Sequence, residues 1–204
     1  MAAQDDEKYE INRCYALILA AGSSSRLGTP KQLLRYKNDN LLQHAINAAM
    51  GAGVKDIVVV LGAYAEQVKG HISGENLHVV FNPDWQTGMA SSIQAGIKAV
   101  QQMQTPPDAA IVSVCDQPFI SADIFNALLS EQRRTGKPIA ACRYGDTIGV
   151  PALFHDSLFE SLLKLNGDSG AKAIIRPHPK DVAIVSFPAG SIDIDTMDEY
   201  KKLQ

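Results

Sequence analysis

The stretch Cys14–Ala20, CYALILA, and the loop that follows it, AGSSSRLGTPKQ (residues 21–32), decide the fold. The first part is a short, continuous apolar run, which is typical of a strand buried on both faces of a parallel sheet. The small residues of the loop allow its backbone to approach a ligand closely. Arg26 and Lys31 add two cations, so the segment predicts a phosphate-binding loop directly after the first strand.

The loop is neither of the two common glycine-rich phosphate motifs. A Walker loop has four residues between its glycines and a lysine directly after the second. Here five residues separate Gly22 from Gly28, and Lys31 follows three positions later. The GxGxxG spacing is absent as well. The alternative interpretation is a serine- and glycine-rich surface loop with two solvated cations. Loops of this composition are common between secondary-structure elements.

Apolar runs and helical spacings alternate along the rest of the chain. Strands are predicted over residues 56–61, 77–81, 109–114, 138–142, 150–154 and 182–187, and helices over residues 41–50, 63–72, 92–102, 157–165 and 171–175, after Ser121 and after Thr196. Such alternation predicts an α/β fold with a three-layer, mostly parallel, Rossmann-like sheet. Ligands of such sheets bind at the carboxyl ends of the strands. Residues 1–13 are predicted to be a flexible leader and residues 14–204 a single domain.

Composition excludes several classes of protein. The chain has 204 residues, 46% of them hydrophobic, and a net charge of −3, which argues against a nucleic-acid partner. No apolar run approaches the roughly 18 residues of a membrane span. The polar, acidic N-terminus is unlike a signal peptide. Cys14, Cys115 and Cys142 are widely spaced and odd in number, which indicates a reducing compartment. The expected location is the cytoplasm, with no membrane partner.

The loop and three later stretches resemble one family. LILAAGSSSRLGTPKQLL (residues 17–34) is similar to the signature loop of the nucleotidyltransferases with a Rossmann-like fold. Within them it resembles most the molybdenum cofactor cytidylyltransferases and their guanylyltransferase relatives. CDQP (115–118), NGDSGAK (166–172) and DIDT (193–196) support the resemblance along nearly the whole chain. The resemblance implies that an acceptor phosphate attacks the α-phosphorus of a nucleoside triphosphate and that pyrophosphate leaves.

The resemblance also implies roles for particular residues. Arg26 and Lys31 would act in catalysis by holding the triphosphate, and Asp168 and Lys172 would contact the acceptor. Lys172 stands where the family commonly has Arg, which keeps the charge but loses the bidentate geometry. The guanylyl members usually have Gly at the position of Ala21, so Ala21 favours cytidine. The nucleotide-binding residues would be Leu19, Ala20, Ala21, Gly22, Ser23, Gly88 and Ser92.

Asp116 comes directly after a predicted buried strand, where the sheet places ligand contacts. Phosphoryl transfer needs neutralisation of charge, and Mg²⁺ is usually held by one or two carboxylates, phosphate oxygens and water. Asp116 is therefore the first predicted metal ligand and a catalytic residue, unless it only caps the helix near Ser121. Mn²⁺ accepts the same oxygen ligands as Mg²⁺.

Asp193 and Asp195 flank Ile194 in a short extended piece, so a period of two places both carboxylates on one side. The resemblance implies that one of these two aspartates is the second metal ligand, and Asp195 is the first candidate. The alternative is that Asp195 only caps the last helix.

These observations predict an enzyme that transfers CMP from CTP to the phosphate of the molybdenum cofactor. Its partners would be CTP, a phosphorylated acceptor such as molybdopterin, and transiently a molybdoenzyme or its chaperone. Three alternatives stay open. They are guanylyl transfer to the same cofactor, cytidylyl transfer to a sugar or polyol phosphate, and a non-catalytic module that binds nucleotide or cofactor. Trp85 could stack on a pterin or a base, or could be a packing residue.

Overall fold

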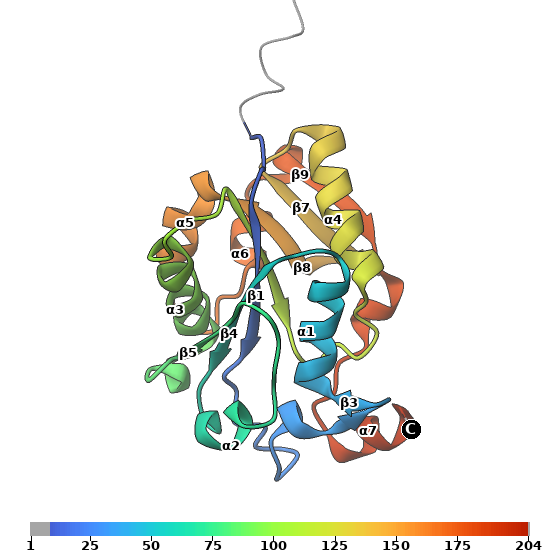
Figure 1. The fold of residues 1–204 in the computed structure, drawn as a ribbon. Coiled ribbons are helices and arrows are strands. Elements are labelled where there is room, and N and C mark those ends of the chain that lie inside the picture. Colours follow the sequence, from blue (N-terminus) through green and yellow to red (C-terminus); the bar gives the residue numbers. More distant parts are fainter. Residues whose placement is uncertain (1–8, 204) are drawn as a thin grey trace, which may run out of the picture.

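The structure is a computed structural model that describes residues 9–203. Its main sheet has seven strands in the order β5-β4-β1-β6-β8-β7-β9. All neighbours pair in parallel except β8, which runs antiparallel to β6 and β7 (Figure 1). The mostly parallel α/β sheet predicted from the sequence is confirmed. The strands are β1 (Cys14–Ala20), β4 (Asp56–Leu61), β5 (Leu77–Phe81), β6 (Ala109–Val114), β7 (Ile139–Tyr144), β8 (Thr147–His155) and β9 (Val182–Ser186), with β2 (Arg35–Tyr36) and β3 (Asp39–Asn40) forming a separate hairpin.

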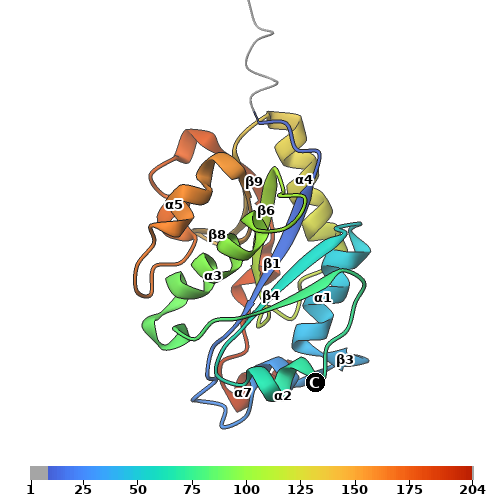
Figure 2. The same cartoon turned by 60° about the vertical axis from the view of Figure 1, so that its left-hand side comes forward.

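Helices cover both faces of this sheet, which gives the three predicted layers (Figure 2). One face carries α1 (Leu41–Gly51), α2 (Ala65–Lys69) and α4 (Ala122–Thr135), and the other carries α3 (Met89–Gln101), α5 (Phe159–Leu163) and α6 (Lys172–Ile175). The last helix, α7 (Met197–Leu203), lies beside β3 (Figure 1). Within residues 9–203, no helix is both long enough and apolar enough to cross a bilayer.

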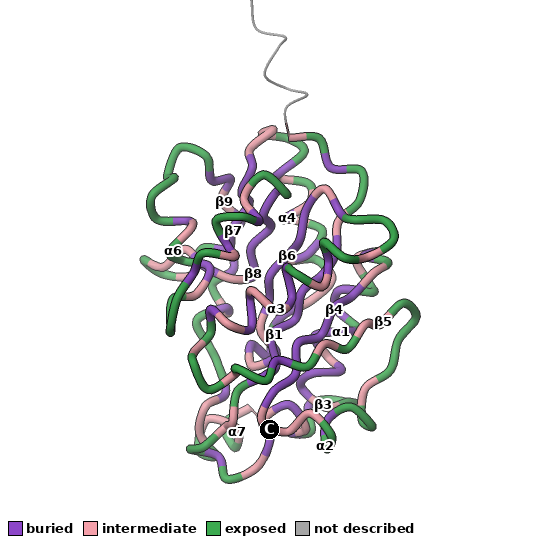
Figure 3. Tube along the Cα trace, turned by 90° about the vertical axis from the view of Figure 1, so that its left-hand side faces the viewer, coloured by how far each residue is buried: buried purple, intermediate pink, exposed green. Residues whose placement is uncertain are grey.

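The central strand β1 shows why the apolar runs become strands. It pairs with β4 on one side and β6 on the other, so that Leu17 lies opposite Val58 and Val112. Because side chains alternate along a strand, Ile18 faces the layer of α1 and α4 whereas Leu17 faces that of α3. Both faces are therefore buried, and the purple trace in Figure 3 follows the strands.

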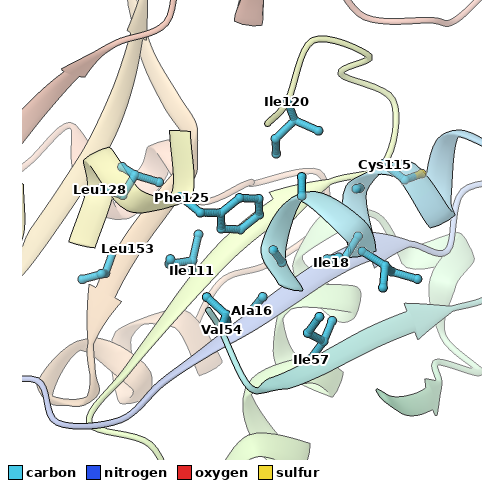
Figure 4. Packing of buried hydrophobic residues seen from close by; sticks show 14 of the residues in the cluster. Ala16, Ile18, Val54, Ile57, Ile111, Cys115, Ile120, Phe125, Leu128 and Leu153 are labelled. Atoms are coloured by element: carbon cyan, nitrogen blue, oxygen red, sulfur yellow. The ribbon is translucent and has the colours of Figure 1, made fainter. Parts of the chain in front are cut away.

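The layer of α1 and α4 packs on the sheet through an aromatic anchor. Phe125 of α4 is fully buried and points toward Ile111 of β6 (Figure 4). Leu128, one turn later, lies on the same face of the helix. Burial of one such side chain stabilises the fold by about 1.5–3 kcal/mol.

Several predicted helix boundaries were wrong, and those of two helices bear on the site. Helix α3 begins at Met89, three residues before the predicted start, because Gly88 ends the preceding turn with a φ of 110°. Ser91 therefore lies inside the first turn, where its hydroxyl donates to the Gly88 carbonyl. The helix predicted over residues 63–72 is shorter in the structure, where α2 covers only Ala65–Lys69.

The boundary of the predicted leader also changes. Residues 9–13 contact the folded domain: Ile11 is buried in the core, and the amides of Asn12 and Arg13 each donate to the Asp108 carboxylate at 2.9 Å. These five residues are therefore part of the packed structure. The remainder of the predicted leader, residues 1–8, lies outside the described residues.

Candidate active site

A cavity of about 260 Å³ lies at the carboxyl ends of β1 and β6, beside the segment that follows β5. We call it the loop cavity. The cavity thus lies at the strand ends, where the sequence analysis expected a ligand to bind. Six of the seven predicted nucleotide-binding residues line this cavity, and Ser23 does not. The six are Leu19, Ala20, Ala21, Gly22, Gly88 and Ser92.

The loop after β1 is braced at three successive carbonyl groups. The Gln32 side chain, only 1% exposed, donates from Nε2 to the carbonyls of Ala20 (2.8 Å) and Gly22 (3.1 Å). The amide of Ala63 donates to the carbonyl of Ala21 at 3.1 Å. The amides of Gly22 and Ser23 have no hydrogen-bond partner among residues 9–203. A rigid loop with free amides is suited to binding an anion.

The predicted cations and carboxylates meet at one edge of the loop cavity. Lys31 Nζ contacts Asp116 Oδ2 at 2.5 Å and Asp195 Oδ1 at 3.0 Å. Arg26 reaches the other oxygen of Asp195 at 2.6 Å. The Lys31 side chain is 15% exposed whereas that of Arg26 is 68% exposed. The structure therefore brings together all four residues, with Arg26 at the rim.

These contacts shift the ionisation of both partners. Burial lowers the pKa of Lys31, but the charge and hydrogen bond of Asp116 outweigh it, so the pKa rises above its ordinary value. Partial burial raises the pKa of Asp195, but the hydrogen bonds and charges of Lys31 and Arg26 lower it overall. Lys31 is therefore cationic and Asp195 anionic at neutral pH.

Asp193 belongs to the same group of carboxylates, but it forms no ion pair with any cation among residues 9–203. Partial burial, with the charges of Asp116 and Asp195, raises its pKa. Between the two aspartates, Ile194 is buried, and its amide donates to the carbonyl of Asp116 at 3.0 Å. The DID segment is thus fastened to the end of β6, so that Asp193 and Asp195 both face the site.

A second cavity, of about 350 Å³, adjoins the loop cavity and shares with it Met89, Val114, Asp116 and Asp168. Gln117, Tyr144, Lys172 and Asp193 line the second cavity but not the loop cavity. Both predicted acceptor-binding residues, Asp168 and Lys172, therefore lie in it. Asp116 stands at the junction of the two cavities, which is where two substrates would meet.

Asp168 reaches the junction because its turn docks on Gly88. The amide of Ala90 donates to the Gly167 carbonyl at 3.0 Å. A Cβ added to Gly88 would lie 2.4 Å from the carbonyl carbon and oxygen of Gly167 and 2.7 Å from Asp168 Oδ1. The close contact at Gly88 is therefore made with this chain's own backbone.

The capping alternatives for the two predicted metal ligands find no support. Helix α7 is capped by Thr196 and Glu199: the Thr196 amide donates to Glu199 Oε2 at 2.7 Å, and the Glu199 amide donates to Thr196 Oγ1 at 3.3 Å. Helix α4 has no side-chain cap at Ser121, and among residues 9–203 the Asp116 carboxylate bonds only to Lys31. Both carboxylates are thus available to the site.

A divalent cation suits this set of charges. Asp116, Asp168, Asp193 and Asp195 outnumber the cations Arg26, Lys31 and Lys172 around the two cavities. A triphosphate would add further negative charge. No three His, Cys, Asp or Glu side chains within residues 9–203 form a metal site by themselves. A metal would therefore bind through one or two carboxylates and complete its coordination with phosphate and water, as Mg²⁺ commonly does.

Sequence reasoning missed three residues of the site. Gln32 braces the loop, Gln117 donates to the Gly190 carbonyl at 2.8 Å beneath the second cavity, and Tyr144 forms part of its wall. The two glutamines were detectable in principle, because each directly follows a predicted charged residue, Lys31 or Asp116. Tyr144 follows a predicted strand without any motif.

The sheet, the braced loop and the junction at Asp116 define an α/β nucleotidyltransferase. A family model described as the MobA-like NTP transferase domain matches residues 16–182. The chain therefore belongs to the MobA-like NTP transferase family, as its resemblance implied.

Proteins similar to this chain have different names. The chain is 31% identical over 196 residues to the nicotine blue oxidoreductase of Paenarthrobacter nicotinovorans, covering 92% of this chain and 94% of that one. The crystal structure of the Mycobacterium tuberculosis Rv0371c homologue from Mycobacterium sp. strain JC1 has a TM-score of 0.80 and 31% identity, covering 94% of both chains. The manganese complex of Rv0371c has a TM-score of 0.74 and 24% identity, covering 95% of this chain and 98% of that one, and shows the likeness of fold alone.

Proposed function

We propose that this protein transfers CMP from CTP to the phosphate of the molybdenum cofactor. In this reaction an acceptor phosphate oxygen forms a bond to the α-phosphorus, the bond to the β-phosphate breaks, and pyrophosphate leaves. The observation that carries the proposal is Asp116 at the junction of two cavities, with Lys31 beside it. Ala21, where the guanylyl members usually have Gly, supports cytidine.

Each cavity would take one substrate. The loop cavity would hold the triphosphate, with the free amide of Gly22 and the ammonium of Lys31 facing its phosphates and Arg26 at the rim. The second cavity would hold the acceptor, and the ammonium of Lys172 would attract the acceptor phosphate. No covalent bond to the protein is needed, because positioning and electrostatics supply most of the catalysis of phosphoryl transfer.

Asp116 and Asp195 would hold Mg²⁺, or Mn²⁺, in this site. Both carboxylates already face one cation, the Lys31 ammonium, so a metal ion could be shared between them in the same way. A bound metal would neutralise phosphate charge. Lys31 would then turn its ammonium toward the triphosphate. Rv0371c, a protein of this fold, has a structure in complex with manganese, which supports a divalent cation in this site.

The test is the substitution Asp116→Asn, which keeps the shape of the side chain and removes its charge. We expect the variant to fold and to lose about 10²-fold or more in turnover, as is usual for one preorganised electrostatic group. Pyrophosphate release is measured with CTP and molybdopterin. The matched control is Asp123→Asn on the exposed side of α4, which should keep wild-type turnover. Turnover of Asp116→Asn within a few-fold of wild type would remove Asp116 from the mechanism.

Substrate comparisons separate the open alternatives. CTP, GTP, ATP and UTP are assayed side by side with molybdopterin, and CTP is then assayed with sugar and polyol phosphates. Preference for GTP would favour guanylyl transfer, and turnover with a polyol phosphate alone would favour that acceptor class. Nucleotide binding by calorimetry without turnover on any acceptor would favour a non-catalytic binding module.

A further inference from the structure

A third cavity lies beyond Lys172, at the edge of the sheet, between the β7–β8 hairpin, α6 and β9. It has a volume of about 340 Å³. We call it the edge cavity. Its rim carries Arg143, Lys172 and Arg176, and its floor is apolar, with Ile175 buried and Ile184 half-buried. An apolar floor with a few charged groups around it is the usual make-up of a small-molecule site.

The cations that line the edge cavity outnumber its carboxylates. Among residues 9–203, neither Arg143 nor Arg176 nor Lys172 forms an ion pair, and Asp146 is the one carboxylate on the lining. The chain as a whole has a net charge of −3, so this gathering of positive charge is local. Guanidinium groups left free beside an apolar surface favour an anionic ligand with an apolar body.

Lys172 connects the edge cavity to the second cavity, because it lines both. Gly149 makes this possible. A Cβ added to Gly149 would lie 2.7 Å from Lys172 Cε and 2.7 Å from the Tyr144 hydroxyl. The Lys172 ammonium stands 5.7 Å from the centre of the Tyr144 ring, within the range of a cation–π contact. The side chain is thus packed across the boundary of the two cavities.

We propose that the edge cavity is a second anionic subsite for the acceptor. An acceptor whose phosphate lies in the second cavity would pass Lys172 and place another anionic group between Arg143 and Arg176. The substrate class is therefore a phosphorylated compound with an apolar or planar body and a second negative charge. This inference rests on the proposed function, because it takes the second cavity as the acceptor's.

Direct binding tests the subsite without requiring catalysis. The probes are 1-naphthyl phosphate, which joins an anion to an apolar ring, and inorganic phosphate, both titrated by calorimetry at low salt. We expect the wild type to bind the naphthyl compound more tightly than inorganic phosphate. The double variant Arg143→Gln, Arg176→Gln should bind naphthyl phosphate about 10-fold more weakly or worse, since two charge-assisted hydrogen bonds are removed. Equal binding by wild type and variant would overturn the proposal.

The matched control also removes two exposed cations. Lys69→Gln with Lys98→Gln lowers the net charge equally but lies on α2 and α3, outside the edge cavity. This variant should bind naphthyl phosphate like the wild type. An equal loss in both double variants would mean that only overall charge matters, and would also overturn the proposal. Thermal unfolding of each variant verifies that it is folded.

Steady-state kinetics then connect the subsite to the acceptor. In the Arg143, Arg176 double variant, KM for molybdopterin should rise about 10-fold while KM for CTP stays unchanged, because the nucleotide lies in the other cavity. An unchanged KM for molybdopterin would refute the acceptor role even if naphthyl phosphate binding is lost. Failure of the proposed function can be distinguished from failure of the subsite. In the first case the wild type would release no pyrophosphate, while calorimetry would still show whether the edge cavity binds naphthyl phosphate.

Discussion

Gly88→Ala should damage stability and acceptor binding together. Gly88 has φ 110° and ψ 178°, a region that is essentially restricted to glycine and costs other residues about 1–3 kcal/mol. The added Cβ would also lie 2.4 Å from the Gly167 backbone. Relief of that contact moves the turn away and breaks the hydrogen bond from Ala90 to Gly167, worth about 1 kcal/mol. The expected loss in the free energy of unfolding is about 2–4 kcal/mol.

Urea unfolding and thermal melting measure the first effect, and for a chain of this size Tm should fall by about 10 °C. Pyrophosphate release measures the second, and KM for the acceptor should rise because Asp168 moves with the turn. The control is Gly70→Ala at the end of α2, which has φ −75° and no neighbour within 4 Å. That substitution should be neutral or slightly stabilising. A Gly88→Ala protein as stable as Gly70→Ala would refute the steric reasoning.

Three further substitutions or titrations test other parts of the site. Partial burial and neighbouring carboxylates raise the pKa of Asp193, so its ionisation above that pKa destabilises the folded state. Asp193→Asn should therefore be more stable than wild type in urea at pH 7, and the gain should vanish in acid. A gain that is the same at every pH would contradict this reasoning. Thr196→Ala removes the cap of α7 and should cost about 1 kcal/mol in chemical unfolding, whereas no loss would mean that Glu199 alone caps the helix. Mg²⁺ at 100 times its Kd should stabilise the wild type by about 2.7 kcal/mol, measured as a shift in Tm. It should stabilise Asp116→Asn and Asp195→Asn much less. A shift in both variants equal to that of the wild type would place the metal elsewhere.

The sequence predicted the fold class because the strands are buried on both faces. A strand such as CYALILA has no polar face to present to water, so its apolar run is continuous and visible in one dimension. The same holds for DIVVVL and AAIVSV. Helix boundaries were harder to predict, since the start of α3 depends on the backbone angle of Gly88 rather than on the serines that follow it.

Part of the site could also be predicted, because parallel strands carry their carboxyl ends to one edge. Asp116 and the loop after β1 were placed together by that rule alone. Gln32 and Tyr144 were not found, since their roles depend on contacts with distant residues: Gln32 on the carbonyls of the loop, and Tyr144 on Lys172 from another element.

By itself, the order of apolar runs and small-residue loops determined the layered sheet, the edge at which ligands bind and the charged residues that gather there. Those properties follow from periodicity and chain direction, which are local. Only the tertiary structure decided that Lys31 stands between Asp116 and Asp195, that the turn at Gly167 rests on Gly88, and that Lys172 crosses from one cavity into the next. These are contacts between segments far apart in the chain, and steric fit and charge in three dimensions select them.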